Sequence, residues 1–116
     1  MPSGSGAADL VYATFIGGNS YDSAYAVAVV NGEAYLTGVT SSFSFPTTPG
    51  AFDGVCGTDG LCNDWDDVFL TVVSADGSSL RYSTYLGGKD QDRALCMAVS
   101  GGEVLLAGET RSSDLP

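Results

Sequence analysis

Short apolar runs separated by turn residues predict that this chain is built from β-strands. The expected strands lie at 24–30, 33–40, 67–73, 80–86, 94–100 and 103–110, with a seventh at Leu10–Ile16. None of these runs has the 3.6-residue spacing of an amphipathic helix. Two of the turns contain only two residues, Asn31-Gly32 and Gly101-Gly102. Such pairs readily adopt the positive φ angles of tight turns, so we expect two β-hairpins.

The first strand of each predicted hairpin is apolar on both faces. Small residues alternate with larger ones over 24–30 and again over 94–100. A strand without a polar face is expected to be covered on both sides. Cys96 takes the position that Ala26 has in the first hairpin, so we expect it to be a small core residue rather than a nucleophile or a metal ligand.

The two hairpins belong to an internal duplication. Residues 10–46 align without a gap on residues 80–116, at a constant offset of 70, and 16 of the 37 positions are identical. Such self-similarity is typical of repeat architectures, in which each unit buries its faces against its neighbours. If the four strands of a unit are called A to D, the chain contains D, then A-B-C-D, then A-B, with C and D of the complete unit at 67–87.

This order predicts an all-β fold of antiparallel four-stranded β-propeller blades, about one and a half to two of them and unclosed within one chain. A parallel β-helix is disfavoured because its coils are much shorter than 70 residues. Residues 10–116 form the repeat region, and the Gly/Ser-containing residues 1–9 are expected to be a flexible leader. The open ends indicate either a piece of a longer propeller or copies that complete each other by strand exchange, into a ring or a filament.

Composition narrows the range of partners. The net charge is −10 with only four cationic side chains, so no basic surface is available for nucleic acid. No apolar run has the length of a membrane-spanning helix, and we expect no membrane insertion. Further blades or copies of the same chain are the expected partners, with a glycan or a protein ligand as a further candidate.

The sequence has no histidine, which excludes Ser-His-Asp and Cys-His catalysis. Asp22 and Asp92 could be suggested as the acid pair of a glycoside hydrolase. They occupy equivalent positions in successive units, however, and a turn-stabilising role repeated once per blade explains them without chemistry. We therefore predict a non-enzymatic protein with no catalytic residues and no required cofactor.

The long connection between the B and C strands of the complete unit carries the other candidate features. Cys56 and Cys62 are expected to form a local disulfide, which favours an oxidising compartment. Aspartates at short spacing suggest a calcium site, although turn formation is the simpler interpretation; the candidate ligands are Asp59, Asp64, Asp66 and Asp67. Aromatic residues either pack the connection onto the blade or form a partner patch; they are Phe43, Phe45, Phe52 and Trp65.

Several of these segments resemble a known repeat. The stretches YATFIGG and YSTYLGG, the Asp22 and Asp92 that follow them, Thr37–Ser42 and Phe45-Pro46 are similar to the SBBP, or seven-bladed β-propeller, repeat. The resemblance implies a propeller blade in a bacterial protein that is exported or held at the cell surface, without an assigned activity. It therefore favours an extracellular structural or interaction module. A lectin-like ligand binder that uses the loop at 43–66 and a fragment of a larger propeller enzyme remain the alternatives.

Overall fold

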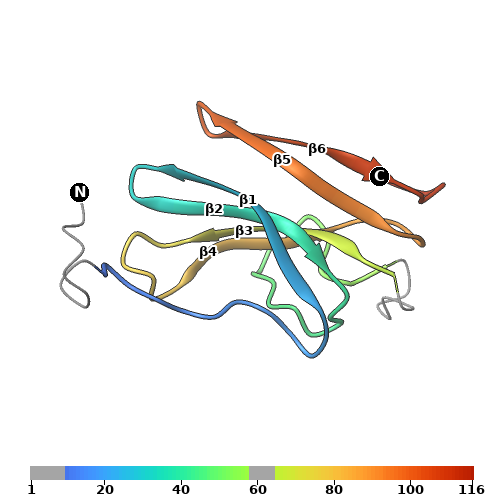
Figure 1. Cartoon of the computed structure of the whole chain (residues 1–116), viewed down its shortest axis with the longest axis horizontal. Helices are drawn as coiled ribbons and strands as arrows, with labels where there is room; N and C mark the ends of the chain where they lie inside the picture. The colour runs from blue at the N-terminus through green and yellow to red at the C-terminus, as the bar shows by residue number, and fades with distance from the viewer. Residues whose placement is uncertain (1–9, 58–64) are drawn as a thin grey trace.

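The computed structural model describes residues 10–57 and 65–116, and within these ranges the fold is all-β with no helix. A four-stranded antiparallel sheet has the order β1-β2-β3-β4, and a separate hairpin pairs β5 with β6 (Figure 1). The elements are β1 (Asp22–Val30), β2 (Glu33–Thr40), β3 (Asp67–Val73), β4 (Leu80–Leu86), β5 (Asp92–Ser100) and β6 (Glu103–Thr110). Six of the seven predicted strands are confirmed, and β1 and β5 begin two residues earlier than expected.

Both predicted hairpin turns are confirmed by their backbone angles. Asn31 and Gly32 have φ of 53° and 82°, and Gly101 and Gly102 have φ of 58° and 81°. Positive φ at both central residues is the geometry that follows the right-handed twist of the flanking strands. Two different dipeptides therefore satisfy one backbone requirement at equivalent positions.

A β-bulge also recurs in both copies. The register shifts between Ala24 and Ala26 in β1, and between Ala94 and Cys96 in β5. Gly38 and Gly108 lie opposite the bulges, where an added Cβ would collide with the carbonyl oxygens of Ser23 and Arg93 respectively. The two hairpins thus share their two-residue turn, their bulge and a glycine opposite the bulge that has no room for a side chain.

The predicted strand at Leu10–Ile16 is wrong, because this segment forms no ladder with any described strand. It runs instead across the four-stranded sheet (Figure 1), where Tyr12, Ala13, Thr14 and Ile16 line a hollow together with side chains of β2 and β3. The Tyr12 ring lies against Gly77 in the turn between β3 and β4. A β-strand needs a neighbouring edge for its backbone hydrogen bonds, and none is provided for this segment within the described chain.

The core lies on the face of the sheet that the connection 41–57 covers. Phe45, Cys56, Phe69 and Tyr85 form a buried cluster against which Ile16 and Leu36 pack. The rings of Phe45 and Phe69 stack with centroids 4.7 Å apart. The Tyr85 hydroxyl donates a hydrogen bond to the Ser42 carbonyl oxygen at 2.6 Å and accepts one from the Phe45 backbone N–H at 3.0 Å. Tyr85 thereby ties the connection to the sheet.

Replacing Tyr85 with phenylalanine is expected to lower the free energy of unfolding by about 1 kcal/mol, because the buried Phe45 N–H and Ser42 carbonyl each lose their short hydrogen bond to the hydroxyl and keep the longer one to each other at 3.4 Å. Urea unfolding followed by circular dichroism measures the change. Tyr82→Phe is the matched control, since within the described chain its hydroxyl accepts a single hydrogen bond, from the exposed Phe52 N–H. Equal losses in the two variants would contradict the role given to Tyr85.

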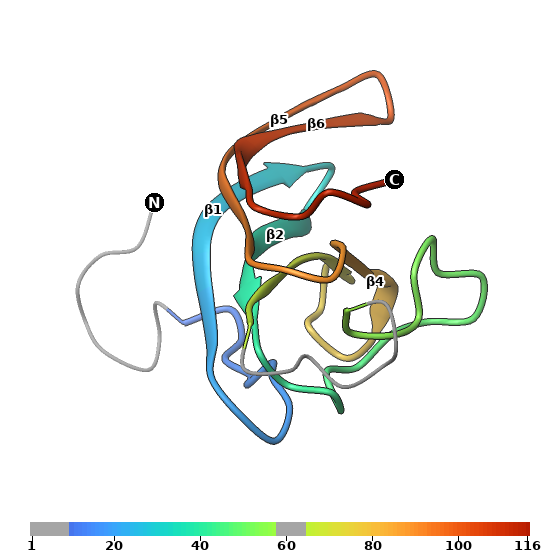
Figure 2. The same cartoon turned by 90° about the vertical axis from the view of Figure 1, so that its right-hand side faces the viewer.

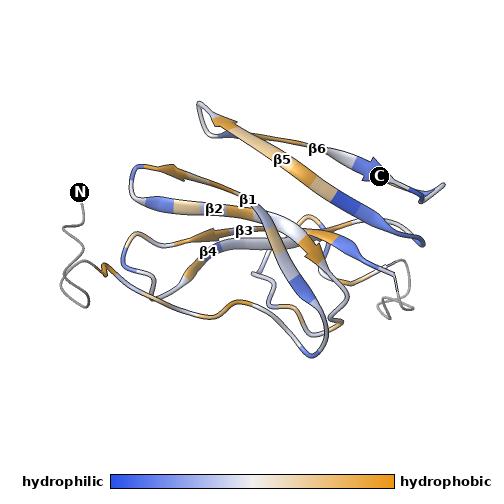
Figure 3. Cartoon of the chain, viewed as in Figure 1, coloured by the Kyte–Doolittle hydropathy of each residue, from blue (hydrophilic) through white to orange (hydrophobic). Residues whose placement is uncertain are grey.

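The hairpin of β5 and β6 packs on the opposite face of the sheet, where β5 contacts β1, β2 and β3 (Figure 2). Apolar residues occupy long stretches of both hairpins and of β3 (Figure 3). The expectation that the first strand of each hairpin is covered on both sides is wrong for the described chain, because Val27 and Val29 of β1 and Cys96 and Ala98 of β5 are exposed. Cys96 is accordingly an exposed free thiol and not a core residue. Its counterpart Ala26 is half-buried because the second hairpin covers it.

Candidate functional site

The Asp22 carboxylate organises the end of the first hairpin. It accepts hydrogen bonds from the Gly18 N–H at 3.0 Å, the Thr40 hydroxyl at 2.5 Å and the Ser42 hydroxyl at 3.1 Å. The Ser42 hydroxyl oxygen also accepts the Ser20 N–H at 2.8 Å. One carboxylate therefore joins the Gly-Gly turn before β1 to the end of β2.

The second copy repeats this network at the same offset. The Asp92 carboxylate accepts the Gly88 N–H at 2.8 Å, the Ser112 hydroxyl at 2.8 Å and the Thr110 hydroxyl. The Ser112 hydroxyl oxygen accepts the Asp90 N–H at 3.0 Å. Every donor position in this network has its counterpart in the first copy. The identity of Thr40 with Thr110 and of Ser42 with Ser112 is the sequence signal for it, which the sequence reasoning did not use.

These networks assign Asp22 and Asp92 to turn stabilisation. The carboxylates are enclosed by hydrogen-bond donors from their own hairpins, and Asp92 is only 1% exposed. A carboxylate that acts in glycoside hydrolysis must reach a substrate. The geometry explains both residues through the fold alone, as their repetition in the sequence suggests.

A second carboxylate meets Asp92 at the junction between the sheet and the second hairpin. Asp67 begins β3, and a Cβ added to Gly87 would lie 2.5 Å from Oδ1 of Asp67 and 2.9 Å from Oδ2 of Asp92. Both carboxylates therefore flank one glycine, whose lack of a side chain makes room for them. The Asp67 Oδ2 accepts the Gly57 N–H at 2.5 Å, and the Asp66 carbonyl oxygen accepts the Asp92 N–H at 2.7 Å.

Burial raises the pKa of Asp67 from 3.8 to about 7. Removal of water from the carboxylate is the largest cause, and the negative charges of Asp92, Asp53 and Asp66 raise the pKa further. The hydrogen bond from Gly57 acts in the opposite direction. Among the described residues no salt bridge reaches Asp67, and Arg93 pairs weakly instead with Asp66 at 4.0 Å and with Glu109 at 3.9 Å.

Only two of the four candidate calcium ligands lie within the described residues. Asp59 and Asp64 lie outside the described residues, while Asp66 and Asp67 lie at the junction. The described residues contain no group of three or more acidic, cysteine or histidine side chains that could hold a metal ion. Within these ranges Asp67 acts as an acceptor for Gly57 and Asp66 as an acceptor for the Gln91 side chain at 3.2 Å.

The predicted disulfide also involves a residue outside the described ranges, Cys62. Cys56 is fully buried within the core cluster, beside Phe45 and Phe69. The connection that carries it is held to β4 by the Asp53 N–H, which donates to the Thr84 hydroxyl at 2.8 Å, and by the Tyr85 N–H, which donates to the Asp53 carbonyl oxygen at 3.0 Å. The pairing of Cys56 with Cys62 stays a prediction.

The four aromatic residues suggested as a partner patch are separated by the fold. Phe45 is a core residue and is unavailable to a partner, whereas Phe43, Phe52 and Trp65 are exposed. Phe52 lines a groove of about 520 Å³ with Leu70 and Tyr82 of the sheet and Val104 and Leu106 of β6.

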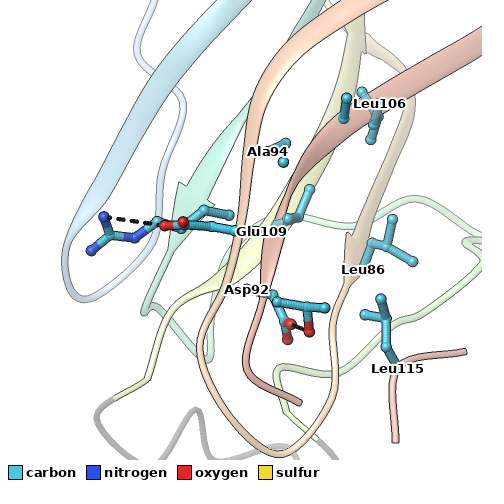
Figure 4. A pocket seen from close by; sticks show the side chains of 11 residues that line it. Leu86, Asp92, Ala94, Leu106, Glu109 and Leu115 are labelled. Carbon is cyan, nitrogen blue, oxygen red and sulfur yellow. Dashed lines mark hydrogen bonds and ion pairs between the residues drawn. The ribbon is translucent and has the colours of Figure 1, made fainter. Parts of the chain in front are cut away.

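This groove continues toward a smaller pocket of about 170 Å³ beside the Asp67–Asp92 junction. The two share Leu86 and Leu106 in their walls. Leu86, Leu106 and Leu115 lie around the smaller pocket, with Asp92 and Glu109 at its polar side (Figure 4). The groove exists because a two-stranded hairpin covers only part of a four-stranded sheet.

The groove has a counterpart on the other face of the sheet. The hollow beneath Leu10–Ile16 is lined by Tyr12, Thr14, Ile16, Ala34 and Leu36. At the offset of 70 these become residues that line the larger groove, Tyr82, Thr84, Leu86, Val104 and Leu106. The segment 10–16 therefore lies against the first hairpin as β4 lies against the second.

No protein-family model matches the chain, and comparisons with curated proteins and with solved structures find no relative. No helix in the described part of the chain is long and apolar enough to cross a membrane.

Proposed function

We propose that this chain is a non-enzymatic structural or interaction module made of propeller-type blades, which works by associating with further blades in other copies of itself. Its setting is extracellular or at the cell surface, as the resemblance to exported repeat proteins and the predicted disulfide suggest. The alternative is a fragment of a larger propeller enzyme. In that case the catalytic groups would lie in other blades of the enzyme.

The observation that carries the proposal is the equivalence of Leu10–Ile16 with β4. The segment keeps the position of a fourth strand against the first hairpin although no strand of the described chain lies beside it to pair with. The second hairpin supplies the first two strands of a blade and leaves the groove at Leu70, Tyr82 and Leu86 uncovered. Apolar faces and sheet edges that the described chain leaves open favour association.

A ligand-binding function is the second candidate. It is favoured by the exposed Phe52, which shares the groove with Tyr82, since aromatic side chains are common in sites that bind sugars and proteins. In this alternative a ligand fills the groove, and the chain has no need to associate with itself.

The molecular mass of the native chain over a concentration series tests the main proposal. We expect either a discrete oligomer or a ladder of species by native mass spectrometry or light scattering, because a head-to-tail contact produces a ring when it closes and a filament when it does not. With a net charge of −10, assembly should strengthen as salt is added. A folded chain that stays monomeric at every concentration and salt level would refute self-association.

A further inference from the structure

Each hairpin has two chemically different faces, which the register of its strands defines. One, named here the valine face, carries Val27, Val29, Ala34 and Leu36 in the first hairpin and Met97, Val99, Val104 and Leu106 in the second. The other, named the alanine face, carries Ala26, Ala28, Tyr35 and Thr37 in the first hairpin and Cys96, Ala98, Leu105 and Ala107 in the second. The duplication thus provides two copies of both faces.

Burial shows which two of these four faces meet within the chain. In the first hairpin the alanine face is half-buried or buried, whereas every counterpart in the second hairpin is exposed. Conversely, Met97 and Val99 are half-buried, whereas Val27 and Val29 are 63% and 68% exposed. Because β5 contacts β1 and β2, the valine face of the second hairpin covers the alanine face of the first.

The two faces left open are of the same two kinds as those that meet within the chain, one valine face and one alanine face. The β1 part of a valine face is free at Val27 and Val29, and an alanine face is free on β5 and β6, where Leu105 is 69% exposed. The remainder of the first hairpin's valine face lies beneath Leu10–Ile16. Such a pair of complementary, non-identical surfaces is the requirement for a heterologous interface.

We propose that copies of this chain stack head-to-tail, with the open alanine face of β5 and β6 in one copy covered by the open valine face of β1 in the next. The occupant of each open face is therefore a second copy, and the contact repeats the one that the chain forms internally between its own hairpins. This inference rests on the proposed self-association and specifies its geometry. Within one chain, β4 lies beside the contact between the two hairpins. In the stack, Leu10–Ile16 of the second copy takes the equivalent position beside the contact between copies, next to the groove at Leu106 of the first copy.

Two single substitutions block the two faces separately. Val29→Asp places a charge on the valine face, and Leu105→Asp places one on the alanine face; both side chains are exposed in the single chain, so folding should be retained and is checked by circular dichroism. Burying an unpaired carboxylate at an apolar contact should weaken association about 100-fold. Val27→Asp and Ala98→Asp are second variants on the same faces, and Val55→Asp, in the connection 41–57, is the control.

Native mass spectrometry of the variants alone and mixed distinguishes the geometries. Stacking head-to-tail predicts that each variant alone is monomeric, that an equimolar mixture of Val29→Asp and Leu105→Asp forms a one-to-one dimer and nothing larger, and that Val55→Asp assembles as the wild type does. A dimer formed by either blocked variant alone would overturn the inference, because it would require a symmetric contact or another surface. A wild-type monomer would refute the proposed self-association itself, whereas wild-type assembly with unaffected variants would refute only this geometry.

Discussion

Replacing Asp92 with alanine is expected to lower the free energy of unfolding by about 3 kcal/mol, because three donors lose a buried charged acceptor at once. These donors are the Gly88 N–H and the hydroxyls of Thr110 and Ser112. The loss is a large fraction of the stability of a small domain. Urea unfolding at pH 6 is the measurement, since most Asp67 is then protonated and relief of its repulsion by Asp92 does not offset the loss.

Asp22→Ala is the matched control for this experiment. It removes the same three hydrogen bonds in the first copy, but the residue is only half-buried, so its loss should be smaller. An unchanged unfolding midpoint in Asp92→Ala would contradict the structural role given to the repeated carboxylate. Equal losses in both variants would instead show that burial does not set the contribution of the network.

Stability is expected to fall as the pH rises from about 4 to about 7, because of Asp67. The unfolded chain releases this proton around the ordinary pKa of 3.8, whereas the folded chain keeps it until about pH 7. The folded state therefore binds more protons in this window, so the contribution is fully present below the lower value and is lost above the higher one. Its size is on the order of 4 kcal/mol.

Asp67→Asn isolates this effect, since the amide oxygen still accepts the Gly57 N–H. We expect the variant to be more stable than the wild type at pH 8 and to match it near pH 4, as measured by urea unfolding at a series of pH values. Asp76→Asn is a control of opposite sign. Hydrogen bonds from Ser78 and Ser74 lower the pKa of that exposed carboxylate to about 2, so the wild type should lose its advantage over this variant as the pH falls. A stability difference between Asp67→Asn and wild type that does not change with pH would refute the assignment.

The two hairpins of this chain have unequal surroundings although their sequences are alike. Cys96 and Ala26 occupy the same position in the repeat, yet one is exposed and the other is half-buried. The difference arises because the second hairpin has a neighbour on only one side within the described chain. If head-to-tail stacking occurs, Cys96 becomes covered and the two copies of the repeat gain equivalent surroundings.

The sequence by itself determined the features that depend on neighbouring residues. Both hairpins were predictable because Asn31-Gly32 and Gly101-Gly102 supply the positive φ that a two-residue turn requires. The strands at 67–73 and 80–86 were predictable from their apolar runs and from the Asp-Gly turn between them. The equivalence of Asp22 with Asp92 followed from the duplication, and both carboxylates have the repeated structural role that it suggested.

Only the tertiary structure decided what depends on contacts between distant segments. Leu10–Ile16 reads as a strand, but strand pairing needs an edge that the described chain does not place beside it. Phe45 resembles its exposed neighbours in the sequence, yet the return of the connection onto Phe69 and Tyr85 buries it. The raised pKa of Asp67 arises because the turn at Gly87 brings β5 back to the start of β3, and burial of a carboxylate is a property of that packing rather than of local sequence.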